Sequence, residues 1–102
     1  MLDSEQAATG FAAVGAAPRI AVLRCLVRAG AEGLNVGQLK ARTAMAASTL
    51  AHHLAVLSQA GLVVQTRMGR ETRNHADFDR LRALSDFLLI ECCADSAEGA
   101  NQ

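Results

Sequence analysis

The chain is poor in aromatic residues. It contains three Phe and neither Trp nor Tyr, although hydrophobic residues make up 51% of its 102 positions. A core without large rings relies on Ala, Leu and Val, which suit closely packed helices. The composition therefore predicts a mostly-α protein, and the length predicts a single domain over residues 1–102. A domain of this size buries a limited core, so pairing with a second copy is expected.

Long apolar runs are absent as well. No stretch approaches the roughly 18 apolar residues that a membrane-spanning helix needs. The first ten residues, MLDSEQAATG, lack the basic region of a signal peptide. We therefore expect a cytoplasmic protein with no membrane partner. Its two ends, about residues 1–4 and 95–102, are expected to be flexible.

Cysteine is scarce, with Cys25, Cys92 and Cys93 as the only examples. Three cysteines at these spacings do not make a disulfide framework, and a cytoplasmic compartment would keep them reduced. Any role they have is expected to be that of thiols.

Net charge is also lacking, but the charges are separated along the chain. Residues 1–76 contain eight Lys/Arg and four Asp/Glu, whereas residues 77–102 contain two and six. The balance changes from +4 to −4, so a basic surface remains available in the first part of the chain. The acidic last segment is expected to face away from a nucleic acid.

The most informative pattern that is present runs from Ala47 to Asp77. With about 100° between successive helical residues, apolar positions gather on one side, namely Ala47, Leu50, Leu54 and Leu57. The opposite side is small and polar, with Ser48, His52, Ala55 and Gln59. Gly61 is expected to stop this helix, and β-rich segments near residues 62–66 and 72–76 predict a hairpin.

Four further helices are predicted around this unit. They cover about residues 3–14, 18–29, 36–42 and 77–94, with Asp3-Ser4-Glu5, Asn35 and Asp77 offering N-caps and Pro18 in a first turn. Their expected inward residues are Ala7, Ala8, Phe11, Val14, Ile20, Leu23, Leu26, Val27, Val36, Leu39, Leu81, Leu84, Leu88 and Cys92. The fold class is thus mostly α with a small β-hairpin (α+β), a winged helix-turn-helix of five helices and a two-stranded wing.

A helix with a small polar face followed by a cationic hairpin is typical of a protein that binds double-stranded DNA. The candidate DNA contacts are Ser48, Thr49, His52, His53 and Gln59 on the helix and Arg67, Arg70 and Arg73 around the hairpin tip. His53 lies at the rim of the apolar stripe, where a structural role is as plausible as a DNA contact. His75 is expected to be structural.

Four segments together resemble the ArsR/SmtB-type (arsenic-repressor) family over roughly residues 10–95. They read APRIAVLRCLVRAG, LNVGQLKART, STLAHHLAVLSQAGLV and HADFDRL. The resemblance implies a homodimer that represses transcription from a DNA operator and dissociates when an inducer binds. Some members of the family use cysteines on the third helix, which NVGQLKA lacks. Zinc sensors of the family use histidines on the last helix, and the last helix of this chain contains no histidine.

The adjacent pair Cys92-Cys93 resembles the branch that senses trivalent arsenic through vicinal cysteines at the end of the last helix. Trivalent arsenic and antimony are soft centres that bind thiolates, so they are the expected inducers, and no permanent cofactor is expected. Adjacent side chains diverge by about 100° on a helix, so both sulfurs reach one arsenic only if the helix end unwinds. The third ligand stays open: Cys25, a small thiol or a partner-chain group can supply it, or a methylated arsenical needs only two.

Other interpretations compete with this one. A thiol redox or persulfide sensor of the same fold would pair Cys25 with Cys93, and cysteines can also simply pack in an interface. A winged helix can serve protein contacts alone. An enzyme is not expected, because the sequence shows no nucleophile and base constellation.

Overall fold

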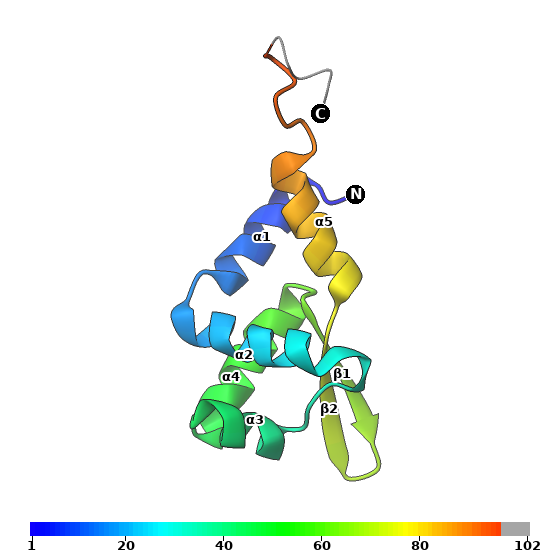
Figure 1. Cartoon of the computed structure of the whole chain (residues 1–102). Coiled ribbons are helices and arrows are strands. Elements are labelled where there is room, and N and C mark those ends of the chain that lie inside the picture. The colour runs from blue at the N-terminus through cyan, green and yellow to red at the C-terminus, as the bar shows by residue number, and fades with distance from the viewer. Residues whose placement is uncertain (97–102) are drawn as a thin grey trace.

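The computed structural model describes residues 1–96, and within them it contains five α-helices, one 3₁₀ turn and a two-stranded antiparallel sheet. In chain order these elements are α1 (Ser4–Val14), α2 (Ala17–Ala29), η1 (Gly30–Glu32), α3 (Val36–Thr43), α4 (Ala47–Gln59), β1 (Val63–Met68), β2 (Glu71–Ala76) and α5 (Phe78–Leu89). Figure 1 shows the hairpin beside α2 to α4 at one end and α1 beside α5 at the other. The predicted winged helix-turn-helix is confirmed.

Three helices start at the predicted caps. Asp3 accepts a hydrogen bond from the backbone of Gln6, and Asn35 does the same for Gln38, in two capping boxes. Asp77 caps α5 through the backbone N–H of Arg80, 3.0 Å away. The first residues, which we expected to be flexible, include Leu2 with only 8% of its surface exposed. Leu2 therefore packs against the core just before the cap.

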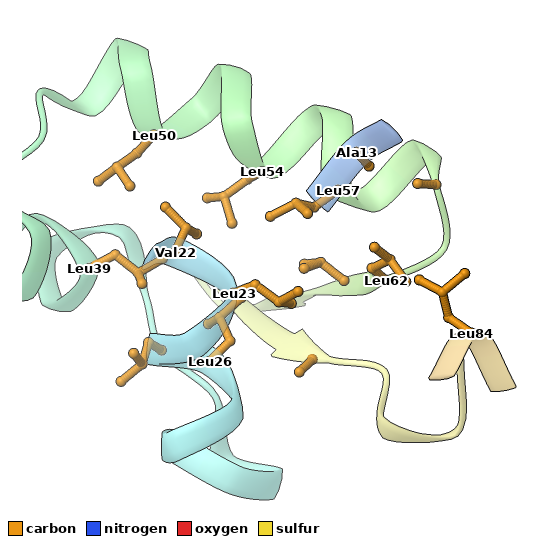
Figure 2. Close-up of a cluster of buried hydrophobic side chains, with 14 of the residues drawn as sticks. Ala13, Val22, Leu23, Leu26, Leu39, Leu50, Leu54, Leu57, Leu62 and Leu84 are labelled. Carbon is orange, nitrogen blue, oxygen red and sulfur yellow. The ribbon is translucent and has the colours of Figure 1, made fainter. Parts of the chain in front are cut away.

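The core lies where α2, α3 and α4 meet. Figure 2 shows leucines of α4 facing Val22, Leu23 and Leu26 of α2 and Leu39 of α3. The prediction for α2 was wrong by part of a turn, because Ile20 and Val27 are 41% and 42% exposed while Val22 is fully buried. α3 and α4 approach α2 on the Val22 side, and that contact sets the buried face. On α1, Ala8 is exposed as well.

The end of α4 follows the prediction. Gly61 has φ +80°, its N–H donates to the Ser58 carbonyl, and the N–H of Leu62 donates to the Leu57 carbonyl at 3.0 Å. This is a Schellman motif, in which a left-handed glycine closes the helix. The strands extend further toward the hairpin tip than predicted, because Met68 already pairs with Glu71 across a two-residue Gly69-Arg70 turn.

The last helix is shorter than predicted. α5 ends at Leu89, whereas the sequence pattern suggested about Ala94, and Cys92 therefore lies outside the helix. Leu88, Leu89 and Ile90 are 67%, 62% and 56% exposed. Isolated helical turns are marginal without packing, so the unsupported end gives way to turns. The part of the tail from 97 to 102 lies outside the described residues.

Over the described residues, no single helix is long and apolar enough to cross a membrane; the pair Ser4–Val14 and Ala17–Glu32 passes such a test only when joined across a bend of 98°.

Candidate DNA-binding surface and thiol site

The outward face of α4 is polar and accessible. Ser48, Thr49, His52 and Gln59 are all exposed, as predicted for side chains that contact DNA. On the opposite side Leu50, Leu54 and Leu57 are at most 1% exposed. Ala47, which we expected on the buried stripe, is exposed because it is the first residue of the helix. α4 thus has one face in the core and one available to a major groove.

His53 differs from the other candidates on α4. It is half-buried, and its Nδ1 atom is buried without a hydrogen-bond partner within the described residues. Burial lowers the pKa of His53, and the nearby charges of Arg19 and His52 lower it further. The Arg19 guanidinium donates to the Ala13 carbonyl at the end of α1, which holds its charge nearby. These contacts indicate a neutral imidazole at the edge of the core.

The three wing arginines have different surroundings. Arg70 is exposed at the turn, and Arg67 is exposed with its Nε donating to the Gly69 carbonyl at 2.8 Å. Arg73 is half-buried, and its Nε forms an ion pair with Glu71 at 3.0 Å. Its Nη1 also donates to the Glu32 carbonyl at 3.3 Å. Arg67 and Arg70 are therefore the wing cations best placed for phosphates, whereas Arg73 joins the wing to η1.

A fully buried polar residue, which sequence reasoning missed, joins the wing to the helical body. Asn74 donates from Nδ2 to the Leu34 carbonyl at 3.1 Å and accepts from Gln65 Nε2 at 2.8 Å. Its backbone exchanges two further bonds with Leu34, both 2.9 Å long. The only sequence signal was an asparagine inside a strand, a position that asparagine usually avoids. Asn74 and its partners are called the wing joint below.

Two neighbouring contacts strengthen the wing joint. Asn35, the cap of α3, donates from Nδ2 to Glu71 at 3.1 Å. The Nδ1 atom of His75 lies 2.9 Å from the Ala31 carbonyl, in keeping with the structural role expected for it. Gly33 has φ +65°, and a Cβ there would collide with the Asn74 carbonyl oxygen. Only glycine allows this approach.

The cysteine pair lies in the segment after α5, residues 90–96, which we call the thiol turn. The Sγ atoms of Cys92 and Cys93 are 3.5 Å apart, and both residues are exposed. Cys93 has φ +63°, in the left-handed region. Both cysteines thus lie in an unwound segment, as the predicted geometry requires. Among the described residues, no group of three or more His, Cys, Asp or Glu side chains is arranged to hold a metal ion.

Cys25 is not part of this pair. It is half-buried on α2 and packs against the hydrophobic core. Figure 1 shows the thiol turn extending from the far end of α5, away from α2. Within one chain the structure therefore brings together Cys92 and Cys93 and leaves Cys25 elsewhere.

An apolar groove of about 380 Å³ lies between α1 and α5, and its lining includes Leu88 and Leu89, which precede the thiol turn. Phe11, Val14 and Leu81 also line it. Leu84, which we expected to face inward, is 5% exposed and packs against Gly10 of α1. The groove thus has a floor made within the chain and apolar walls that remain open.

A helix-turn-helix domain family matches residues 19–66, which extend from α2 into β1. An ArsR-like transcriptional regulator from Rhodococcus sp. RHA1 superposes with a TM-score of 0.74 at 26% identity, covering 89% of this chain and 82% of that one. The chain has the winged helix-turn-helix fold and is similar to ArsR-type transcriptional regulators. The vicinal cysteines of the chain lie just beyond its last helix.

Two further structures are similar. A "possible transcriptional regulator for arsenical resistance" has a TM-score of 0.64 at 26% identity, over 78% of this chain and 83% of that one. A homodimeric winged helix-turn-helix DNA-binding domain from Mycobacterium bovis has a TM-score of 0.69 at 23% identity, over 84% and 78%. No curated protein matches the chain. These three solved structures are of a transcriptional regulator, a possible transcriptional regulator and the DNA-binding domain of a possible one.

Proposed function

We propose that this protein is a homodimeric ArsR-type repressor that leaves its DNA operator when a trivalent arsenical or antimonite binds Cys92 and Cys93. The observation that supports the inducer is the pair of exposed sulfurs 3.5 Å apart. Each other part of the proposal depends on a separate surface of the molecule.

DNA binding is supported by α4 and the wing tip. The exposed side chains of Ser48, Thr49 and His52 are short or planar, so the helix can approach base edges in a major groove. Arg67 and Arg70 lie at the tip of the hairpin, where cations reach phosphates on the flanking backbone. The helix would supply sequence discrimination and the wing would supply affinity that depends on salt.

A homodimer is supported by the open groove between α1 and α5. Exposed apolar walls such as Leu88 and Leu89 favour burial against a second copy. The Mycobacterium bovis relative is itself homodimeric. A two-fold dimer would place two α4 helices on successive major grooves, and its operator would be palindromic.

The sulfur geometry favours a pyramidal centre. Trivalent arsenic and antimony hold their thiolates on one side, whereas a linear two-coordinate ion separates them as far as it can. Sulfurs of neighbouring residues 3.5 Å apart suit the first arrangement. Since the described residues offer two thiols at this point, the site fits best an arsenical whose third position is an organic group, such as methylarsenite. Arsenite itself would need Cys25, a small thiol or a partner-chain group.

The thiol turn and the groove are neighbours, which suggests how binding reaches DNA. Leu88 and Leu89 line the groove and immediately precede the turn. An arsenical that fixes the turn would alter the end of α5 and thereby the dimer contact that sets the spacing of the two α4 helices. The inducer then acts only through the difference in its affinity for the two dimer arrangements.

A fluorescence-anisotropy titration tests the proposal. Operator-bound wild type should dissociate on addition of methylarsenite, and Cys92→Ser or Cys93→Ser should bind operator normally but ignore the arsenical. Cys25→Ser is the matched control and should respond as wild type does. Induction that persists in the Cys92→Ser/Cys93→Ser double variant would refute the site, and loss of induction in Cys25→Ser would make Cys25 a ligand.

A further inference from the structure

The two sulfurs of the thiol turn face each other although they belong to consecutive residues. In a regular helix such neighbours point about 100° apart. The chain has left the α-helix at Leu89, and the next bonds are turn-like, from Cys92 N–H to the Leu89 carbonyl and from Ala94 N–H to the Glu91 carbonyl. The backbone is thereby free to place both Sγ atoms on one side, 3.5 Å apart.

The backbone of Cys93 is itself unusual. Its φ of +63° lies in the left-handed region, which residues other than glycine seldom adopt. The other such residue in the described part of the chain, Ala44, closes the C-terminus of α3, where a left-handed residue is ordinary. Cys93 closes no described α-helix. Local strain of this kind gathers at functional sites, and at Cys93 it accompanies the close approach of the two sulfurs.

We propose that Cys92 and Cys93 form a site of reversible oxidation, which hydrogen peroxide closes into a disulfide between adjacent residues. In the first step one thiolate sulfur attacks the peroxide, an S–O bond forms, the O–O bond breaks, and water leaves after proton transfer. In the second step the other sulfur attacks the sulfenic acid, an S–S bond forms, the S–O bond breaks, and a second water leaves. The dithiol loses two electrons and two protons, and the peroxide is reduced to two waters.

Covalent geometry makes this bond easy to reduce. Consecutive Cα atoms are about 3.8 Å apart across a trans peptide, shorter than the roughly 4.4–6.8 Å of ordinary disulfides. A strained and exposed disulfide is more oxidising and more labile than a buried structural one. Both cysteines are exposed, so a cellular dithiol of the thioredoxin class can reach and reopen the bond.

Closure would silence the response to the inducer, an inference that rests on the proposed function. A disulfide has no thiolate to give to arsenic, so the oxidised repressor would stay on its operator in the presence of arsenical. Oxidation would therefore oppose induction. The redox pair is also distinct from a bridge between Cys25 and Cys93, because Cys25 packs against the core on α2.

Mass spectrometry of trypsin digests tests the site directly. The full chain is treated with hydrogen peroxide, free thiols are alkylated, and the protein is digested. Cys92 and Cys93 share the peptide 83–102, whereas Cys25 lies in the peptide 25–28. We expect peptide 83–102 to lose two hydrogens and to take up no alkyl group, and the change to disappear after treatment with a dithiol.

Three single variants serve as controls. Cys25→Ser should give the same loss of two hydrogens, and Cys92→Ser or Cys93→Ser should not. Alkylation of both thiols of peptide 83–102 after peroxide treatment would overturn the proposal. A cross-link to peptide 25–28, or a cross-link between two chains through peptide 83–102, would do so as well.

The two proposals fail separately. If the reduced protein ignores methylarsenite on its operator while peroxide still closes the disulfide, the arsenical function is wrong and the oxidation site stands. If the reduced protein responds but peroxide leaves peptide 83–102 unchanged, the oxidation site is wrong alone. When both hold, peroxide-treated protein should lose its response to methylarsenite and regain it on reduction.

Discussion

The two ends of the molecule are built in different ways. At the DNA-binding end, α2, α3 and α4 bury leucines completely, and the wing joint attaches the hairpin through a fully buried asparagine. At the other end, α1 and α5 leave an open apolar groove, and Leu88 to Ile90 are more than half exposed. One chain is sufficient to shape the DNA-binding end. The other end exposes an apolar groove and the thiols of Cys92 and Cys93, which a second molecule can contact.

The largest contrast is expected between two leucines. Leu54 is 1% exposed in the core and Leu88 is 67% exposed on the groove. Leu54→Ala should lower the free energy of unfolding by about 2–5 kcal/mol, because it removes buried side-chain atoms and leaves a cavity. Leu88→Ala should leave monomer stability nearly unchanged and weaken the proposed dimer. Urea denaturation and sedimentation measure the two effects, and equal stability losses would break the contrast between the ends.

The wing joint should show the next largest effect. Asn74→Ala removes partners of the Leu34 carbonyl and of Gln65, so it should cost about 1–3 kcal/mol of stability. Thr66→Ala is the matched control, since Thr66 is exposed on β1 and its loss should cost about 0.5 kcal/mol or less. Thermal unfolding compares the two variants. An Asn74 variant as stable as the Thr66 variant would mean that the wing is held without this residue.

Among the arginines, position should decide the effect on DNA binding. Arg70→Ala at the wing tip should make the dependence of log affinity on log salt shallower by roughly 2 in a dimer, in which each subunit then lacks one phosphate partner. Arg82 is exposed on α5, at the other end of the molecule, so Arg82→Ala should leave that slope unchanged. Anisotropy titrations over a range of salt concentrations measure it. Equal changes in both variants would show that DNA reaches the α5 end.

The same titrations can separate the helix from the wing. His52→Ala or Ser48→Ala on α4 should reduce discrimination between operator and unrelated DNA by about 1–3 kcal/mol for each side chain that reads a base edge. Arg67→Ala should weaken binding to both DNAs alike. A loss of specificity confined to the wing variant would contradict the proposed docking.

The smallest expected effect concerns His53. Its folded pKa lies below the usual 6.5, so between the two values the unfolded chain binds more protons than the folded one. The free energy of unfolding should therefore fall as the pH drops below about 6.5. His53→Gln should remove part of that dependence, and His52→Gln should remove a smaller part, because the charge of His52 is the least of the three causes of the lowered pKa. Identical pH profiles for wild type and His53→Gln would refute the inference.

Sequence reasoning succeeded where local chemistry decides the structure. Caps at Asp3 and Asn35, the glycine stop at Gly61 and the buried side of α4 all depend on residues within a few turns of each other. The wing joint could not be predicted, because Asn74 and Leu34 are 40 residues apart and nothing local marks their pairing. The buried side of α2 was misjudged by part of a turn for the same reason.

For the thiol turn, the sequence predicted the chemistry but not where the helix ends. The adjacent cysteines were evident in the sequence, and the need for an unwound helix followed from geometry. The position of the break did not, because the apolar residues Leu88, Leu89 and Ile90 continue a helical pattern that nothing in the described part of the chain covers. These three apolar residues form an exposed surface, and the helix ends where packing within the chain ends.

The exposure of both sulfurs also bears on how fast the proposed sensor can respond. Because the Sγ atoms of Cys92 and Cys93 are already close and accessible, no opening motion precedes capture. The rate of capture should then grow in proportion to arsenical concentration without reaching a plateau, as expected for a collision-limited step. In stopped-flow measurements, dissociation from DNA would then be the only step that is delayed after arsenical is added. The time between exposure and transcription would depend on the lifetime of the protein on its operator.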